Sequence, residues 1–445
     1  MSFTNNNMPA RAGLFKSTGF KYSLALFTGI IIGHSYVPDS VMMVLDIIFG
    51  FYLILIALKG DLVQLFTFLP YFLYSEVYIR AFRSSLPNLF ADYCLLAVFS
   101  LLLLKQGTKL RLYSYSFVFA GLYALIEIVD IYRTTEPDFA RINVLNSVNL
   151  FIISFWASSN ILKLSVLNNF LNNLKIAGIY VAGIVMSAHI FGTIVYTDVS
   201  SYSSSNGLAP VQLSAYLGLG VILLFLSMVN PLEKKDFFLN IAFMVIVGSV
   251  MLLTFSRGGL YFFAIIVMLY LMFNRKSLGS YFIILMLLPA AYIIYYFVVQ
   301  TTNGLIIDRY QQSGTSGRNI LIDIGFQIFK SEPLSGIGTG NFSREIVARH
   351  LYDVESGAHN EFVRAAAEHG IIGILTYWTF YVYIFFEVIL RKGVFRQYSL
   401  YFFALFCLIL VHNGLKIALQ PALLVLIIAT PAFVLAGKNK HDPGS

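Results

Sequence analysis

Apolar runs of 16 to 22 residues, separated by short polar segments, follow one another along almost the whole chain of 445 residues. A helix of that length crosses a hydrocarbon core of about 30 Å. The alternating pattern of a membrane β-barrel is not found in the sequence. The pattern therefore predicts an all-α polytopic membrane protein with about 12–14 transmembrane helices. The segments that we expect to span are 22–37, 41–58, 62–80, 89–104, 114–132, 144–162, 176–197, 211–229, 236–255, 259–273, 278–298, 370–390, 398–415 and 420–437.

Composition and charge agree with this class. Hydrophobic residues make up 58% of the chain and charged residues only 12%, against about 25% charged in soluble domains. The compact basic clusters "KQGTKLR", "EKKD", "NRK" and "RKGVFR" all fall on the same side of the membrane as the N-terminus. The positive-inside rule then places both termini in the cytoplasm. Cys94 and Cys407 lie in apolar runs, so they indicate neither a disulfide framework nor a metal cluster.

Most connections are short, and residues 299–369 form one long outer loop, which in a compact protein is usually functional. Its stretch "GRNILIDIGFQIFK" has helical spacing of apolar positions before "SEPLSGIGTGN" interrupts it with Pro and Gly. We therefore divide the chain into an N-terminal transmembrane bundle (1–235), a hairpin with the following span (236–298), the large loop carrying short helices and the active site (299–369), and C-terminal helices with a tail (370–445).

The basic residues differ in type between the two sides. Those inside are mostly Lys, whereas those outside or embedded are mostly Arg, at positions 80, 83, 133, 141, 257, 309, 318, 344, 349 and 364. A guanidinium fork binds phosphate or carboxylate with two hydrogen bonds. Any one of these residues could simply cap a helix end. The set as a whole favours an anionic ligand on the outer side, with Arg80 and Arg309 among the candidate substrate-binding residues.

Two motifs place such an Arg beside glycine. In "TFSRGGLYFF" (254–263), Arg257 lies at or just outside membrane depth, where an ionisable side chain is costly without a partner. It either snorkels to the interface or acts as a fixed cation over a ligand phosphate. In "SGRNILIDIG" (316–325), Arg318 stands at a helix start, and a helix N-terminus with a guanidinium forms an anion site.

A third motif, "AHNEFVRAAAEHGIIG" (358–373), gathers polar side chains just before a span. On a helix, Glu361, Arg364 and Glu368 lie on one stripe. An ion pair of Arg364 with Glu368 on a solvated face is the simplest interpretation. His359 at the start of the motif is a candidate for moving a proton near neutral pH.

These motifs occur in a telling order: "FSRGG" at the end of one span, "GR" in the loop, then "PLSGIGTGNF", then "AHNEF" and "AAEHGIIG" before the next span. Over about residues 236–390 the chain resembles the O-antigen polymerase and O-antigen ligase superfamily of bacterial envelope glycosyltransferases. The N-terminal half is similar only in being a bundle of spans.

The resemblance implies a GT-C-like enzyme of the bacterial inner membrane with its active site at the periplasmic face. Its donor would be an oligosaccharide on undecaprenyl pyrophosphate and its acceptor a lipid-linked glycan, both presented by the membrane. The family is held to use no metal and needs no nucleotide sugar, so no cofactor and no nucleic acid are expected. A chain-length regulator is a further candidate partner.

Matched motif by motif, the family's functional Arg residues fall on Arg257 and Arg318, and its His falls on His359. The two Arg residues would stabilise the charge that develops on the leaving pyrophosphate. His359 would act as general base toward the acceptor hydroxyl. Glu361 or Glu368 is an alternative base, with His359 then binding phosphate. The candidate substrate-binding residues in the motif are Asn360, Glu361, Arg364 and Glu368.

Three functions follow from these observations. A polymerase would transfer the growing glycan onto an undecaprenyl-pyrophosphate-linked repeat unit, and a ligase would transfer it onto lipid A-core. The number of predicted spans favours the polymerase. A lipid-linked sugar transporter is a remote alternative, because the sequence has no inverted repeat and no pair of Gly/Pro-broken spans in matching halves.

Overall fold

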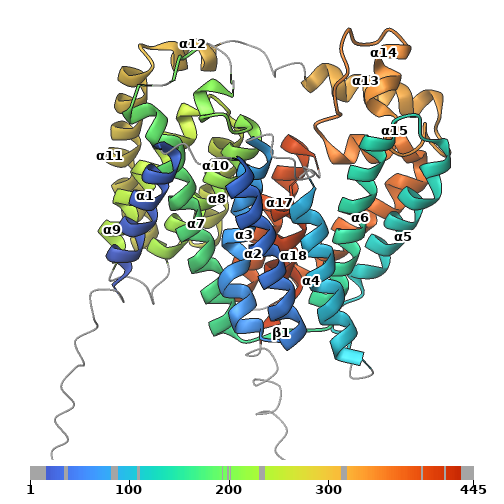
Figure 1. The fold of residues 1–445 in the computed structure, drawn as a ribbon, viewed down its shortest axis with the longest axis horizontal. Helices are drawn as coiled ribbons and strands as arrows, with labels where there is room; N and C mark the ends of the chain where they lie inside the picture. The colour runs from blue at the N-terminus through green and yellow to red at the C-terminus, as the bar shows by residue number, and fades with distance from the viewer. Residues whose placement is uncertain are drawn as a thin grey trace, which may run out of the picture.

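The computed structural model describes residues 17–34, 39–81, 89–107, 111–192, 194–197, 200, 202–229, 236–311, 318–391, 394–414 and 417–431 (Figure 1). Within them the chain is an all-α bundle, as predicted. The helices of the bundle are α1 (Thr18–His34), α2 (Asp39–Lys59), α3 (Leu62–Ala81), α4 (Phe90–Gln106), α5 (Ser116–Val129), α6 (Pro137–Ser158), α7 (Leu164–Ile190), α8 (Pro210–Val229), α9 (Phe237–Leu253), α10 (Gly258–Phe273), α11 (Leu278–Thr301), α15 (Glu361–Gly373), α16 (Thr379–Ile389), α17 (Val394–Asn413) and α18 (Leu419–Ile428).

Every segment predicted to span the membrane contains a helix. Among the described residues, six helices are long and apolar enough to cross a membrane: Ser40–Lys59, Pro137–Ser158, Leu164–Ile190, Pro210–Val229, Leu278–Thr301 and Glu361–Ile389. Shorter apolar helices are Leu62–Val77, Phe237–Leu253, Gly258–Phe273 and Leu419–Ile428. The chain is therefore a polytopic membrane protein by its fold, whereas the total of 12–14 spans stays a prediction.

Two helices begin well before the predicted segments. α6 starts at Pro137 instead of 144, and α7 starts at Leu164 instead of 176. Polar residues lie near the start of both helices, so the apolar run that a hydropathy pattern detects begins only after them. In α7 the amide of Asn173 is used inside the bundle, where its Oδ1 accepts a hydrogen bond from the Tyr71 hydroxyl (3.0 Å). Tertiary partners thus extend the helix where apolarity does not.

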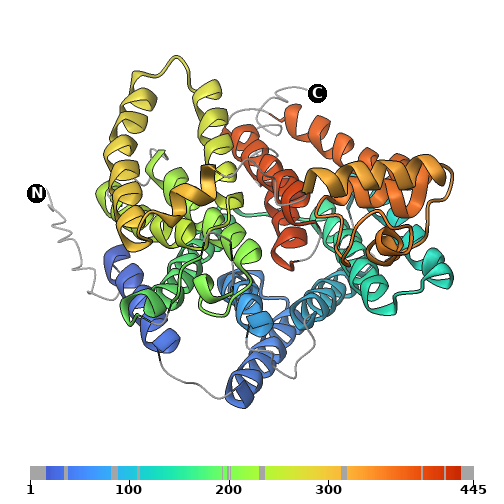
Figure 2. The same cartoon turned by 90° about the horizontal axis from the view of Figure 1, so that it is seen from above.

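The bundle is built around α7 and α8. α7 packs against α1, α3 and α8, and α8 packs against α9 and α10. Nearly all of α8 is buried, whereas α11 lies on the rim and exposes most of its residues (Figure 2). α5 and α6 form a second group with α15 and α16 on the other side of α17 and α18.

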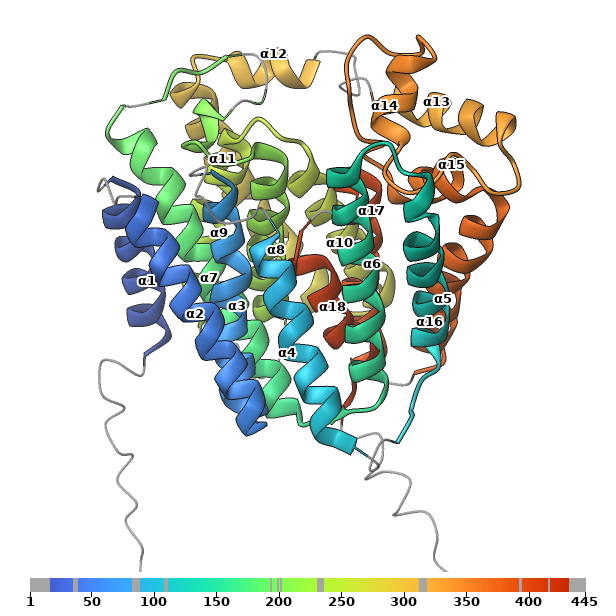
Figure 3. The ribbon, with the colours of Figure 1, turned by 45° about the vertical axis from the view of Figure 1, so that its right-hand side comes forward.

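The short helices predicted in the large loop are present at one end of the bundle, which we call the loop end (Figures 1 and 3). They are α12 (Leu305–Gln311), α13 (Arg318–Ser331) and α14 (Phe342–Ala348). The loop is shorter than predicted, because α11 continues to Thr301 and α15 begins at Glu361. At the opposite end, β1 (Ile161–Leu162) pairs in parallel with β2 (Thr430–Pro431).

A break in the helix separates α17 from α18, and the residues of this break that the structure describes are buried. The Gln420 side chain supplies hydrogen bonds to the backbone of this break. Its Nε2 donates to the Gly414 carbonyl (2.6 Å), and its Oε1 accepts from the Ile417 amide (3.1 Å). Glu76 on α3 accepts from the Ala418 amide (2.9 Å). Because α18 has 10 residues, it is about 15 Å long, so the break lies inside the bundle.

The glycine-rich segment between α13 and α14 lies against α15. Three backbone hydrogen bonds join them, from Ile337 to Ala367 (3.1 Å), from Gly338 to Glu368 (2.8 Å) and from Ile371 to Pro333 (2.8 Å). The contact requires glycine at two positions with left-handed backbone, Gly336 (φ 61°) and Gly370 (φ 59°). Gly370 also breaks the regular geometry of α15.

Gly336→Ala is expected to destabilise the protein by about 2–4 kcal/mol, through backbone strain and overpacking. An added Cβ would lie 2.3 Å from the carbonyl carbon of Glu368. Gly304→Ala is the matched control, because Gly304 has φ 84° but nothing within 4 Å of such a Cβ. Melting temperatures in detergent would compare the two variants. Equal melting temperatures would contradict the close packing at Gly336.

Candidate active site

The "SRGG" motif forms the turn between α9 and α10 at the loop end. Phe255 has left-handed backbone (φ 57°), a strained conformation for a bulky residue, and its side chain is fully buried. Ser214 on α8 fixes the turn from both sides. Its hydroxyl donates to the Ser256 carbonyl (3.3 Å) and accepts from the Gly259 amide (3.0 Å). Strain held by surrounding packing in this way is common at functional sites.

The two glycines of the motif allow close contacts in different directions. A Cβ on Gly259 would meet the Ser214 carbonyl at 2.5 Å, and one on Gly218 would lie 2.8 Å from the Cα of Gly259. α8 and α10 therefore touch through their backbones. A Cβ on Gly258 would meet the ring of His412, on α17, at 2.5 Å. The motif thus brings Arg257 beside the end of α17.

Arg257 reaches the short helix α12. Its Nη2 donates to the carbonyl of Arg309, and its guanidinium lies 5.5 Å from the centre of the Tyr310 ring. Arg309 in turn donates from Nε to the Phe255 carbonyl (3.5 Å). Burial raises the pKa of Tyr310 to about 12, so the phenol keeps its proton as a donor. Among the described residues, its buried hydroxyl has no hydrogen-bond partner.

Arg318 is the first residue of α13, and its side chain reaches His412 on α17. Its Nη1 is 2.7 Å from Nδ1 and 3.1 Å from Nε2 of His412. Burial lowers the pKa of Arg318 below its ordinary value, and the nearby charge of Arg309 adds to the effect. We call Arg257, Arg309 and Arg318 the arginine cluster.

His359 also approaches this cluster. It lies within electrostatic reach of His412, as Arg318 does. Its backbone is left-handed (φ 49°), and the next residue, Asn360, caps α15 by accepting from the amides of Phe362 (3.0 Å) and Val363 (3.3 Å). The cap fixes where α15 begins and therefore where His359 lies.

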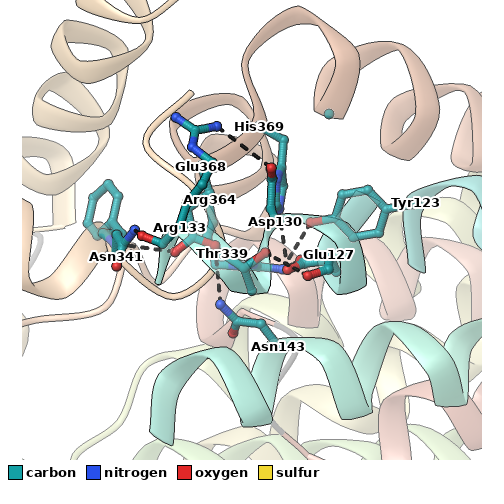
Figure 4. A network of polar contacts seen from close by, with 12 residues as sticks. Tyr123, Glu127, Asp130, Arg133, Asn143, Thr339, Asn341, Arg364, Glu368 and His369 are labelled. Atoms are coloured by element: carbon teal, nitrogen blue, oxygen red, sulfur yellow. Dashed lines mark hydrogen bonds and ion pairs between the residues drawn. The ribbon is translucent and has the colours of Figure 1, made fainter. Parts of the chain in front are cut away.

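The rest of the "HNEF" motif forms a separate buried network (Figure 4). Arg364 is 6% exposed and Glu361 and Glu368 are 3% and 1% exposed, which excludes a solvated surface stripe. Arg364 binds Glu361, Glu368 (2.5 Å) and Glu127 of α5 (2.7 Å), and it donates to the hydroxyl of Tyr123 (3.0 Å). We call these residues the Arg364 network.

His369 extends the network along α5. Its Nδ1 is 2.8 Å from Asp130 and its Nε2 is 3.3 Å from Glu127. Ligand atoms of Glu127, Glu368 and His369 lie within 4.8 Å of one another, a spacing that suits a metal ion. However, the guanidinium of Arg364 already binds both carboxylates. The arrangement therefore suits an internal ion pair better than a cation site.

The structure divides the predicted site residues into two groups. It brings Arg257, Arg309, Arg318 and His359 together at the loop end. It places Asn360 in a helix cap and the other three candidate substrate-binding residues of the motif in the Arg364 network. The ion pair of Arg364 with Glu368 is present, but it is buried. Arg80 lies in α3, and its side chain is outside the described residues, as are Ser316 and Gly317 before α13.

Sequence reasoning missed the partners that other helices supply. His412, Glu127 of α5 and Asp130, which follows α5, carry a sequence signal only as ionisable residues inside apolar runs. They lie 94 to 239 residues from their partners, so no spacing rule connects them. Tyr310 gives no signal of its own.

The comparison with protein families defines the class of this region. Residues 242–378 match the model of the O-antigen ligase family. The match confirms the predicted resemblance of this region to the O-antigen polymerase and O-antigen ligase superfamily. The match includes the arginine cluster, His359 and Arg364. No curated protein matches the chain.

Proposed function

We propose that the protein is an O-antigen polymerase of the bacterial inner membrane. It would transfer a growing glycan from undecaprenyl pyrophosphate onto an undecaprenyl-pyrophosphate-linked repeat unit. The observation that supports this proposal best is the convergence of Arg257, Arg309 and Arg318 with His359 at one end of the bundle. A cluster of three guanidinium groups suits a pyrophosphate, which carries several negative charges.

In the proposed reaction, the acceptor hydroxyl oxygen attacks C1 of the donor sugar. The bond between C1 and the pyrophosphate oxygen breaks, and undecaprenyl pyrophosphate leaves with the electron pair. The arginine cluster stabilises this developing charge without moving, and the hydroxyl of Tyr310 offers a further donor. His359 accepts the proton of the acceptor hydroxyl. In this scheme the protein's own cations supply the electrostatic stabilisation, and the GT-C-like assignment rests on the family resemblance.

The Arg364 network would serve as a support rather than a binding surface. Glu361 and Glu368 are buried and bound to Arg364, which makes His359 the better candidate for the base. Because Asn360 caps α15, the network and the cap together hold His359 at the start of this helix. Residues that pack and hydrogen-bond behind a base in this way keep it at a fixed distance from its substrate.

The loop end would face the periplasm, with both termini in the cytoplasm. This orientation rests on the basic clusters of the sequence and on the position of α12, α13 and α14 at one end. A periplasmic site would meet donor and acceptor glycans on that side of the membrane.

An O-antigen ligase is the second candidate, because the matched family bears that name. The two functions share the donor and differ in the acceptor. The lipopolysaccharide banding pattern of a strain lacking the protein separates them. Core with a single repeat unit and no ladder would support the polymerase. Bare core with long glycan on undecaprenyl pyrophosphate would support the ligase, and an unchanged ladder would contradict both.

His359→Asn is expected to reduce glycan transfer by about 100-fold or more, since it removes the general base. Asn tolerates left-handed backbone, so the change should leave the fold intact. His350→Asn is a matched control, because His350 is exposed in the same loop and also has left-handed backbone (φ 54°). Ladder formation at equal protein level would be compared in complemented strains. Similar ladders from both variants would contradict the role of His359.

A further inference from the structure

We propose that His412 is a positioning residue that holds the guanidinium of Arg318 in place to bind the donor pyrophosphate. The inference rests on the proposed function and adds a residue from outside the matched family region. Its basis is the contact between Nη1 of Arg318 and the imidazole nitrogens, at 2.7 and 3.1 Å.

The direction of this hydrogen bond fixes the state of the imidazole. A guanidinium has only donors, so His412 must accept, and it can do so only as a neutral ring. Both ring nitrogens lie within hydrogen-bonding distance of Nη1, and we assign the nearer one, Nδ1, as the acceptor. A neutral acceptor orients Arg318 without cancelling its charge. A carboxylate in the same place would bind the guanidinium itself and compete with an anionic ligand.

The imidazole is itself held from two sides. Gly258 leaves just enough space for it, because a Cβ there would lie 2.5 Å from its Cδ2 and Nε2. Phe262, one turn further along α10, presents its ring at right angles to it, with centroids 5.7 Å apart. The "RGG" sequence therefore has two effects: it provides Arg257, and it shapes the contact surface for the residue that orients Arg318.

The contact joins a loop helix to the bundle, because Arg318 begins α13 and His412 lies on α17. Among the described residues, His412 provides the side chain that forms a hydrogen bond with Arg318. Because α17 belongs to the packed bundle, the contact with His412 fixes Arg318, on a loop helix, relative to the bundle.

Binding of undecaprenyl pyrophosphate in detergent, measured by microscale thermophoresis, would test the inference with a double-mutant cycle. His412→Phe keeps a flat ring but removes the acceptor, and we expect it to weaken binding by about 10- to 100-fold. In an Arg318→Ala background the same change should alter binding less than about twofold, because the two residues act as one unit. His412→Asn places an oxygen near the position of Nδ1 and should restore most of the binding.

Gly258→Ala provides a second variant in case His412→Phe folds poorly. Its methyl group would push the imidazole away from Arg318 with both residues still present, and we expect binding to fall as in His412→Phe. Melting temperatures would be recorded for all variants.

The outcomes separate the inference from the proposed function. Weak binding by Arg318→Ala with normal binding by His412→Phe and Gly258→Ala would overturn the inference alone. So would equal losses in His412→Phe and His412→Asn, or losses that multiply in the double variant. A wild-type protein that does not bind undecaprenyl pyrophosphate would overturn both.

Discussion

Arg318→Ala and Arg257→Ala are each expected to abolish the glycan ladder while the protein still accumulates and melts near the temperature of the unmodified chain. Loss of one preorganised donor to a developing anion costs about 10²–10³-fold in rate. Both residues are only partly buried and lie at the loop end, Arg257 just before α10 and Arg318 at the start of α13. Because neither side chain belongs to the packed core, stability should change little.

Two further variants define what the arginine cluster supplies. Arg318→Lys keeps the charge but loses the planar fork, so we expect an intermediate rate. Arg344→Ala is the control, because Arg344 lies in the same loop with a side chain 52% exposed and a long contact to Glu136 (3.8 Å). Ladders on stained gels would report glycan transfer, and immunoblots of membranes would report the protein level. A full ladder from Arg318→Ala and Arg257→Ala would refute the assignment of the donor site.

Arg364→Met is expected to have the opposite effect, a loss of the folded protein itself. The guanidinium neutralises Glu127, Glu361 and Glu368, all of which are almost completely buried. Removing one partner of a buried ion pair costs about 3–5 kcal/mol, since the remaining charges stay desolvated. Here three carboxylates lose their common partner, and the variant should melt at a much lower temperature or fail to accumulate.

Neutralising the partners should reverse much of this loss. In Arg364→Met combined with Glu361→Gln and Glu368→Gln, two of the unpaired charges are gone, and buried amides are cheaper than buried carboxylates. Melting temperature in detergent would be measured for the single and the combined variants. If Arg364→Met melted like the unmodified protein, the network would not have the structural role described above.

The sequence predicts the helices well and their beginnings less well. Long apolar runs identify each helix, because a lipid environment requires apolar surface and internal backbone hydrogen bonds. The beginnings of α6 and α7 escape this rule, since they carry polar residues. Asn173, bound to Tyr71, illustrates the limit: whether a polar residue lies inside a helix depends on a partner 102 residues away.

For the site, the motifs predict Arg257, Arg318 and His359 as one group, and the structure brings them close together. The polar residues after His359 could not be assigned in the same way. Their stripe on α15 is correctly predicted, but a stripe does not reveal that α5 supplies Glu127 to cover it. His412 follows the apolar run "LFCLILV", and its partner, Arg318 of α13, lies 94 residues away in the sequence.

The buried break between α17 and α18 has a practical consequence for labelling the protein. Tags and reporters are tolerated where backbone is exposed and free of tertiary hydrogen bonds. Gln420 closes this break from within, so an inserted reporter would have to enter the packed interior and would separate the two helices. Gly192 and Gly304, which have open space around them, are better insertion points for testing which side of the membrane the loop end faces.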